Sequence, residues 1–495
     1  MLTEYRREYT EFNESITREH YLHYSGQKTE YELERIYDRY SDLFTRQAIG
    51  DLQREYDGIS PDFDNDRKGV RHLLTFAKEN FLEAQTKQLT AEIAEHEATS
   101  HIYWEGREVP FHRSAILLRN EPDAGRRRQI YERRLRVIEG SNDLRTERLQ
   151  KIYDSAADLG HKSYVEMCQD LYGVDYATLN EKWQAFLNAT DEVYTIRVRE
   201  QLLRELKVGL ENAHRADVGS LMRLTRFDQY FPKDRLVEMY RETVSGLGID
   251  IEKQKNIRID SAERPQKNPR AFCAPVEVPA EVMLVILPSG GQTDYQTFLH
   301  EGGHAQHFGF ASSSLRPEFR YSGDRALSEI YAFLLQYLIT DAEWLRSVVG
   351  MPEPEEFVRL MLLDKLLLLR RYAGKLDYEL KLHSSGNIPA GSRYYVDTLT
   401  QATLFQYEPE EFLADMDDGF YSADYLRAWA FEVMLRDYLR TKFGRTWWQS
   451  KRAGDLLKEI WNTGNRYRAD EIIEQVGAGK LSTEPVTDEF IQGLR

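Results

Sequence analysis

The stretch "YQTFLHEGGHAQHFGF", residues 295–310, places His300, Glu301, His304 and His307 within eight positions of an apolar segment. The whole chain has twelve histidines, so three of them in so short a segment indicate a shared chemical purpose. His300 and His304 are four positions apart, and on a helix their side chains emerge on one face.

The residues before this stretch predict how the helix begins. "EVMLVIL" (281–287) is short, apolar and partly β-branched, which is typical of a strand. "PSGG" (288–291) ends that strand, and Thr293 or Asp294 then caps a helix that runs to about Phe310. We expect a strand, a tight glycine turn and a helix in succession.

The pattern H-E-x-x-H is typical of zinc sites, because two neutral imidazoles one helical turn apart bind one Zn²⁺. Glu301 lies beside the first histidine, where a carboxylate reaches a zinc-activated water rather than the metal itself. The motif is short enough to occur by chance. The alternative is that His300 and His304 are two hydrogen-bonded histidines on a buried helix face.

A catalytic zinc needs a third protein ligand. The segment "SGDRALSEIYAFLLQYL" (322–338) is strongly helical, and Glu329 stands on its apolar side, 25 residues after His304. A carboxylate among apolar neighbours needs a metal or a counter-charge, so Glu329 is the candidate ligand and a buried ion pair is the alternative. His307 is then expected to support or pack against the site.

Helical periodicity dominates the rest of the chain, most clearly over residues 30–56, 126–157, 177–207 and 356–383. Prolines interrupt it between 264 and 288. We therefore expect a helical N-terminal lobe over 1–263 and a catalytic lobe over 264–495, the latter as one continuous body.

Composition limits the kinds of binding partner and the cellular compartment that we expect. The formal net charge of −16 argues against nucleic acid or an anionic membrane as the main partner. Two cysteines are too few for a disulfide framework, and the N-terminal residues carry no apolar signal segment, so a cytoplasmic protein is expected. We expect a monomer, with a homodimer as the alternative.

The sequence resembles the thimet oligopeptidase and oligoendopeptidase F family of zinc metallopeptidases, which are gluzincins. The resemblance rests on H-E-x-x-H followed 25 residues later by Glu329, on "PRAFCAP" (269–275) leading into the strand, and on "DDGFYSADYLRAWAFEVMLRDYL" (417–439). It covers about residues 265–440, and the first half of the chain carries no specific motif.

This resemblance implies a mainly α, two-lobed helical metallopeptidase with a deep substrate channel and a small β-element beside the zinc helix. It implies one Zn²⁺ per chain, held by His300, His304 and Glu329, with Glu301 as the general base. The expected activity is that of a zinc-dependent metalloendopeptidase, or oligopeptidase, that hydrolyses short unfolded peptides. The strand 281–287, if it were an edge strand, could hold an extended peptide.

The resemblance also assigns Tyr421 and Tyr425 as donors to the oxyanion of the reacting carbonyl. Two positions depart from the family pattern, because Met416 stands where a histidine is expected and Ala428 where a third tyrosine is expected. Arg427 and His383 are therefore further candidate donors to the oxyanion.

Two other functions stay open from the sequence. One is a catalytically weak or inactive peptide-binding relative, which the departures from the pattern would suit. The other is a di-iron carboxylate oxidase, because "EGGH" (301–304) and "ENAH" (211–214) are both E-x-x-H motifs. Metal content separates the readings, since one zinc per chain is expected of a peptidase and two irons of an oxidase.

Overall fold

The computed structural model describes residues 1–495 and is mainly α-helical, with 21 α-helices and five short strands. The helical fold class predicted from the sequence periodicity is therefore confirmed. No helix combines the length and the apolar composition that crossing a bilayer requires.

The chain forms two compact units, each built from three separate segments. The first unit comprises Met1–Asn80, Thr225–Val358 and Arg427–Leu481, and the second comprises Phe81–Leu224, Arg359–Leu426 and Ser482–Arg495. The expected lobes, 1–263 and 264–495, divide the chain at one point. In the structure, segments of the first unit alternate along the chain with segments of the second. The reason is that three long helices, α4, α16 and α18, each contribute residues to both units.

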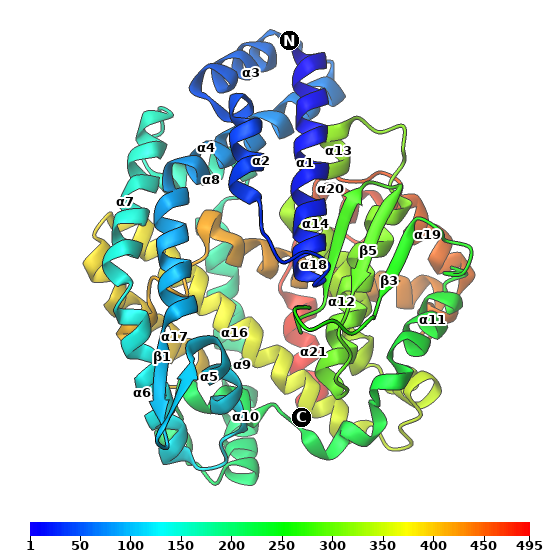
Figure 1. The fold of residues 1–495 in the computed structure, drawn as a ribbon. Helices are drawn as coiled ribbons and strands as arrows, with labels where there is room; N and C mark the ends of the chain where they lie inside the picture. Colours follow the sequence, from blue (N-terminus) through cyan, green and yellow to red (C-terminus); the bar gives the residue numbers. More distant parts are fainter. The chain divides into compact units, whose positions relative to one another are not determined.

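The first unit carries the histidine-rich helix and the sheet (Figure 1). Its elements are α1 (Leu2–Tyr24), α2 (Leu33–Arg39), α3 (Arg46–Gly58), the start of α4 (Asp64–Thr99), α11 (Leu236–Gly246), β3 (Ile257–Asp260), β4 (Phe272–Glu277), β5 (Glu281–Val285), α12 (Gln292–Phe310), α13 (Pro317–Tyr321), α14 (Arg325–Gln336), α15 (Ala342–Trp344), most of α18 (Tyr421–Phe443), α19 (Lys451–Trp461) and α20 (Ala469–Gln475).

The second unit is helical apart from one hairpin. Its elements are the remainder of α4, β1 (His101–Trp104), β2 (Arg107–Pro110), α5 (Phe111–Asn120), α6 (Ala124–Glu139), α7 (Asn142–Asp158), α8 (Tyr164–Tyr172), α9 (Tyr176–Glu205), α10 (Val218–Leu221), most of α16 (Glu355–Ser385), α17 (Gly391–Thr403), the start of α18 and α21 (Glu484–Leu494).

The predicted strand is β5, and it lies in the centre of a three-stranded sheet in the order β3-β5-β4. It pairs in parallel with β3 and antiparallel with β4. The expectation that this strand could be a peptide-binding edge is therefore wrong, because both of its sides are already paired. The sequence signal for β3 is only four residues, "IRID", and was missed.

The sheet supports α12 by packing between two helices. One face, with Ala274, Val276, Met283 and Val285, forms an apolar cluster that includes Tyr21 of α1. Helix α12 packs against β4 and β5. Burial on both faces explains why β5 is a continuous apolar run rather than an alternating one.

Candidate metal site

The predicted glycine turn and helix lead into the site. Helix α12 begins at Gln292 after Gly291, whose φ of +90° is readily adopted only by glycine, and it ends at Phe310 as expected. The predicted side-chain cap is absent. Asp294 instead turns back and accepts the backbone N–H of Gly290 at 2.7 Å, which ties the glycine turn to the helix.

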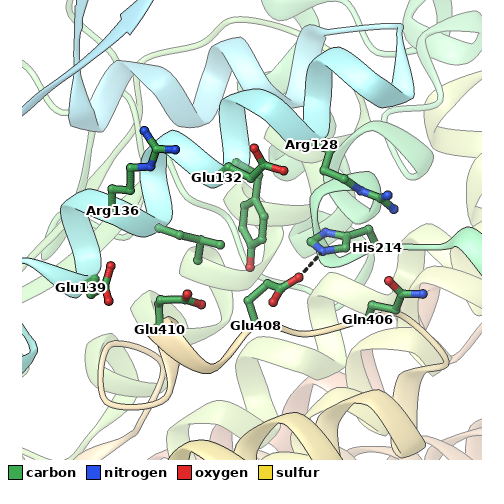
Figure 2. Close-up of a pocket in the computed structure, with 10 residues that line it drawn as sticks. Arg128, Glu132, Arg136, Glu139, His214, Gln406, Glu408 and Glu410 are labelled. Carbon is green, nitrogen blue, oxygen red and sulfur yellow. Dashed lines mark hydrogen bonds and ion pairs between the residues drawn. The ribbon is translucent and has the colours of Figure 1, made fainter.

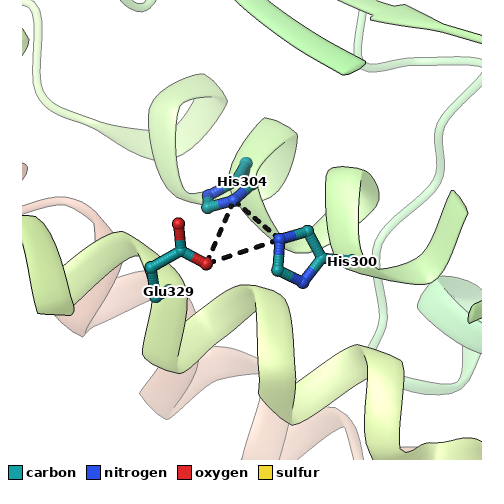
Figure 3. A group of neighbouring side chains, drawn as sticks. All are labelled: His300, His304 and Glu329. Atoms are coloured by element: carbon teal, nitrogen blue, oxygen red, sulfur yellow. Dashed lines mark hydrogen bonds and ion pairs between the residues drawn. The ribbon is translucent and has the colours of Figure 1, made fainter. Parts of the chain in front are cut away.

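Three predicted residues converge on one point between α12 and α14 (Figure 3). The Nε2 atoms of His300 and His304 are 3.2 Å apart. Oε2 of Glu329 lies 3.4 Å from Nε2 of His300 and 3.7 Å from Nε2 of His304. They are the only group of metal-ligating side chains that the structure brings together over residues 1–495.

These separations fit the donor geometry of a zinc ion. Four ligands at about 2.1 Å in tetrahedral arrangement lie about 3.4 Å from one another, close to the three spacings observed. The donor set of two imidazole nitrogens and one carboxylate oxygen is also the set that leaves a fourth position open in catalytic zinc sites.

Both histidines have a hydrogen-bond partner on the far side of the ring. Nδ1 of His300 lies 2.8 Å from Oε1 of Gln336, and Nδ1 of His304 lies 2.7 Å from Oγ of Ser328. Ser328 and Gln336 were not predicted from the sequence. The available signal was that, between Arg325 and Tyr337, they are the only neutral polar side chains besides Tyr331 in the apolar run around Glu329.

Burial sets the protonation of the site. Loss of solvent lowers the pKa of His300 and of His304 to about 4, and for His300 the nearby ring of His304 contributes to this lowering. Both imidazoles are therefore neutral near pH 7, as metal binding requires. Glu329 is buried beside them and is the one acid of the group.

Glu301 lies next to His300 with its carboxylate held by the sheet. Its Oε2 accepts the backbone N–H of Cys273 in β4 at 2.9 Å. Burial and the nearby charge of Glu329 raise the pKa of Glu301 to about 8, against the smaller effect of the Cys273 N–H. A pKa this close to neutrality lets one carboxyl group both take up and release a proton near pH 7.

Tyr421 and Tyr425 belong to the second unit, at the start of α18. Their rings are in edge-to-face contact with centroids 4.8 Å apart. The turn before Tyr421 contains two successive left-handed residues, Gly419 (φ +64°) and Phe420 (φ +55°). Such a turn is costly for phenylalanine and persists only where the surrounding structure holds it.

Glu379 is the main anchor of that turn. It is fully buried and accepts the backbone N–H of Asp417 at 2.8 Å and the hydroxyl of Ser422 at 2.5 Å. The N–H of Gly419 donates to the Tyr164 hydroxyl at 2.7 Å. Tyr421 is thus fixed in position within the second unit.

The two further candidate donors have other partners. Arg427 donates two hydrogen bonds, of 2.8 and 2.6 Å, to Asp324, the N-terminal cap of α14. His383 is buried between Tyr164 and Phe420, and its Nδ1 lies 2.9 Å from the Tyr153 hydroxyl. Arg427 is therefore a structural residue of the first unit and His383 a core residue of the second.

The second E-x-x-H motif does not form a metal site. Glu211 and His214 lie in two short 3₁₀ segments with their flanking turns rather than on a helix. His214 borders a surface hollow of about 420 Å³ along α6, where its Nε2 bonds Oε1 of Glu408 at 2.9 Å (Figure 2). The pair of facing helices that a di-iron site requires is not formed.

The fold is mainly α-helical, and side chains from two of its helices, α12 and α14, form a group that could hold a metal ion. A crystal structure determined at 3.1 Å, of a protein provisionally described as oligoendopeptidase F, aligns with 99% of this chain and 89% of its own. The TM-score is 0.70 and the sequence identity 14%, so the likeness establishes a shared fold. No protein-family model and no curated protein matches the sequence.

Proposed function

We propose that this protein is a zinc-dependent oligopeptidase that hydrolyses short unfolded peptides. The observation that supports this most directly is the convergence of His300, His304 and Glu329 at spacings of 3.2–3.7 Å, with Glu301 beside them. The fold shared with the oligoendopeptidase F-like structure is consistent with the same conclusion.

His300, His304 and Glu329 would hold the zinc ion. Bound zinc would supply Lewis acidity toward a peptide carbonyl and toward water. The chain itself supplies the proton acceptor: Oε2 of Glu301 is fixed by the Cys273 N–H, so its Oε1 is left to take a proton from the attacking water and pass it to the leaving amine.

Tyr421 and Tyr425 are proposed to donate to the oxyanion through their phenol hydroxyls. Support comes from their spacing in "DGFYSADY" and from the anchored turn that fixes Tyr421 within its own unit. A soluble peptide would be the partner, and a monomer remains the expected state.

The test combines metal analysis with turnover of a quenched fluorescent peptide library. We expect about one zinc per chain, loss of turnover with a chelator, and recovery on adding Zn²⁺. Glu301→Gln should keep its zinc and lose about 10²–10⁴-fold in turnover, because an amide does not accept the proton. The exposed Glu343→Gln is the matched control.

Two results would contradict the proposal. Two irons per chain would identify an oxidase. A zinc-loaded protein that binds peptides and leaves them intact would identify an inactive peptide-binding relative.

A further inference from the structure

His307 extends the hydrogen bonding of the site away from the metal-ligand face. It is fully buried, one helical turn beyond His304 on α12. Its Nδ1 lies 3.1 Å from Oγ of Ser328, the same hydroxyl that contacts Nδ1 of His304. Its Nε2 lies 3.3 Å from the backbone carbonyl oxygen of Gly464. The His304 ring, the Ser328 hydroxyl, the His307 ring and the Gly464 carbonyl thus form one continuous hydrogen-bond chain.

The Gly464 carbonyl determines which group donates in each hydrogen bond of this hydrogen-bond chain. A carbonyl oxygen only accepts, so Nε2 of His307 carries the proton. An imidazolium buried without a carboxylate partner is costly, so His307 is neutral and its Nδ1 is an acceptor. The Ser328 hydroxyl then donates to His307, and its oxygen accepts from Nδ1–H of His304.

The Gly464 carbonyl is itself held firmly. Gly464 adopts a left-handed conformation with φ of +55°, and a Cβ there would come within 2.5 Å of the Phe319 carbonyl oxygen. The next residue, Asn465, donates its N–H to that same oxygen at 2.8 Å. The turn after α19 is thus packed directly against α13, which leaves the carbonyl little freedom to turn away.

We propose that Ser328 and His307 are positioning residues that, with the Gly464 carbonyl, hold His304 in its Nδ1–H tautomer and so leave Nε2 free to bind metal. The inference rests on the proposed metal site. An imidazole has two neutral tautomers, and only the one with a bare Nε2 presents a lone pair toward His300 and Glu329. The hydrogen-bond chain favours that tautomer already in the metal-free protein.

The first test is zinc affinity, measured by competition of the full-length protein with a chromophoric chelator. Ser328→Ala should weaken zinc binding by about 10–100-fold, and Ser328→Thr, which keeps the hydroxyl, should recover most of it. Ser347→Ala is the control, because that exposed hydroxyl donates only to the Glu343 carbonyl within its own turn.

The second test addresses the donor–acceptor direction of the hydrogen-bond chain. In His307→Phe the Ser328 hydroxyl loses its acceptor and becomes free to donate to Nδ1 of His304, which favours the wrong tautomer. Zinc affinity should therefore fall at least as far as in Ser328→Ala, although His307 does not touch the ligand group. In metal-free protein with ¹⁵N-labelled histidine, NMR should show His304 protonated at Nδ1.

The outcomes separate this inference from the proposed function. Should the parent protein fail to bind zinc, the proposed metal site is wrong, and the hydrogen-bond chain does not position a metal ligand. If the parent binds zinc and both variants bind it equally well, Ser328 and His307 are only packing residues, and the proposed function stands. A His304 protonated at Nε2 in the parent would overturn the assigned polarity. If His307→Phe fails to fold, Ser328→Ala and the NMR measurement still decide.

Discussion

Gly303 controls how closely α12 and α14, the helices that carry the proposed metal ligands, approach each other. A Cβ at this position would lie 2.4 Å from the Tyr331 carbonyl oxygen and 2.6 Å from Cα of Ala332, both in the backbone of α14. Ordinary contacts of a Cβ begin near 3.4 Å. In Gly303→Ala, α12 and α14 therefore have to separate by about 1 Å, because backbone atoms cannot rotate away as a side chain does.

That displacement acts directly on the proposed metal site. His304 is carried by α12 and Glu329 by α14, and metal–ligand distances tolerate shifts of about 0.2 Å. A separation of about 1 Å exceeds that tolerance several-fold. We expect Gly303→Ala to lower zinc affinity by at least about 10-fold and to destabilise the fold by about 1–3 kcal/mol through overpacking.

The matched control is Gly309→Ala on the same helix. Its Cβ would come within 2.5 Å of Cδ1 of Ile257, the end of a side chain that can change rotamer. Both replacements share the helix preference of alanine over glycine, about 1 kcal/mol, so their difference isolates the backbone contact. Chelator competition and urea unfolding measure both quantities. Equal zinc affinity and stability in the two variants would refute the argument.

Three further changes test other parts of the protein. Glu329→Ala should lose zinc and activity together, while the exposed Glu343→Ala keeps both; unchanged zinc affinity would place the third ligand elsewhere. Tyr421→Phe should lower kcat by about 10²–10³-fold with zinc content unchanged, and normal turnover would make this tyrosine a packing residue. Burial lowers the pKa of His383 to about 3, so the unfolded chain binds more protons below pH 6.5 and stability falls with falling pH. Urea unfolding of His383→Phe should show about 2 kcal/mol less loss between pH 7 and 5 than the parent, whereas an exposed-site change, His112→Phe, should not alter that loss.

The sequence was informative where chemistry depends on local spacing. Four positions on a helix are enough to align His300 with His304. One acid in an apolar helix is enough to mark Glu329, because a buried carboxylate needs a partner. The strand and glycine turn before α12 were also predictable, since glycine and proline mark the ends of elements.

Pairing between distant segments was not predictable from the sequence. The four residues of β3 are a strand because β5 pairs with them, and their own pattern is too short to indicate it. Glu318 has the sequence neighbours of a surface acid, yet it is fully buried and paired with Arg6 of α1 at 2.7 Å. The Gly464 carbonyl lies 157 residues from His307, and no local pattern joins them.

Helix α14 explains why so few residues define the site. It supplies Glu329 to the ligand group, and it also supplies Ser328 to His304 and Gln336 to His300. One helix therefore provides one proposed ligand and hydrogen-bond partners for the rings of the other two. Its N-terminus is held in turn by the buried pair of Asp324 with Arg427. A shift of α14 would disturb all three proposed ligands at once, so changes at Gly303 and at Asp324 should both lower metal affinity as well as stability.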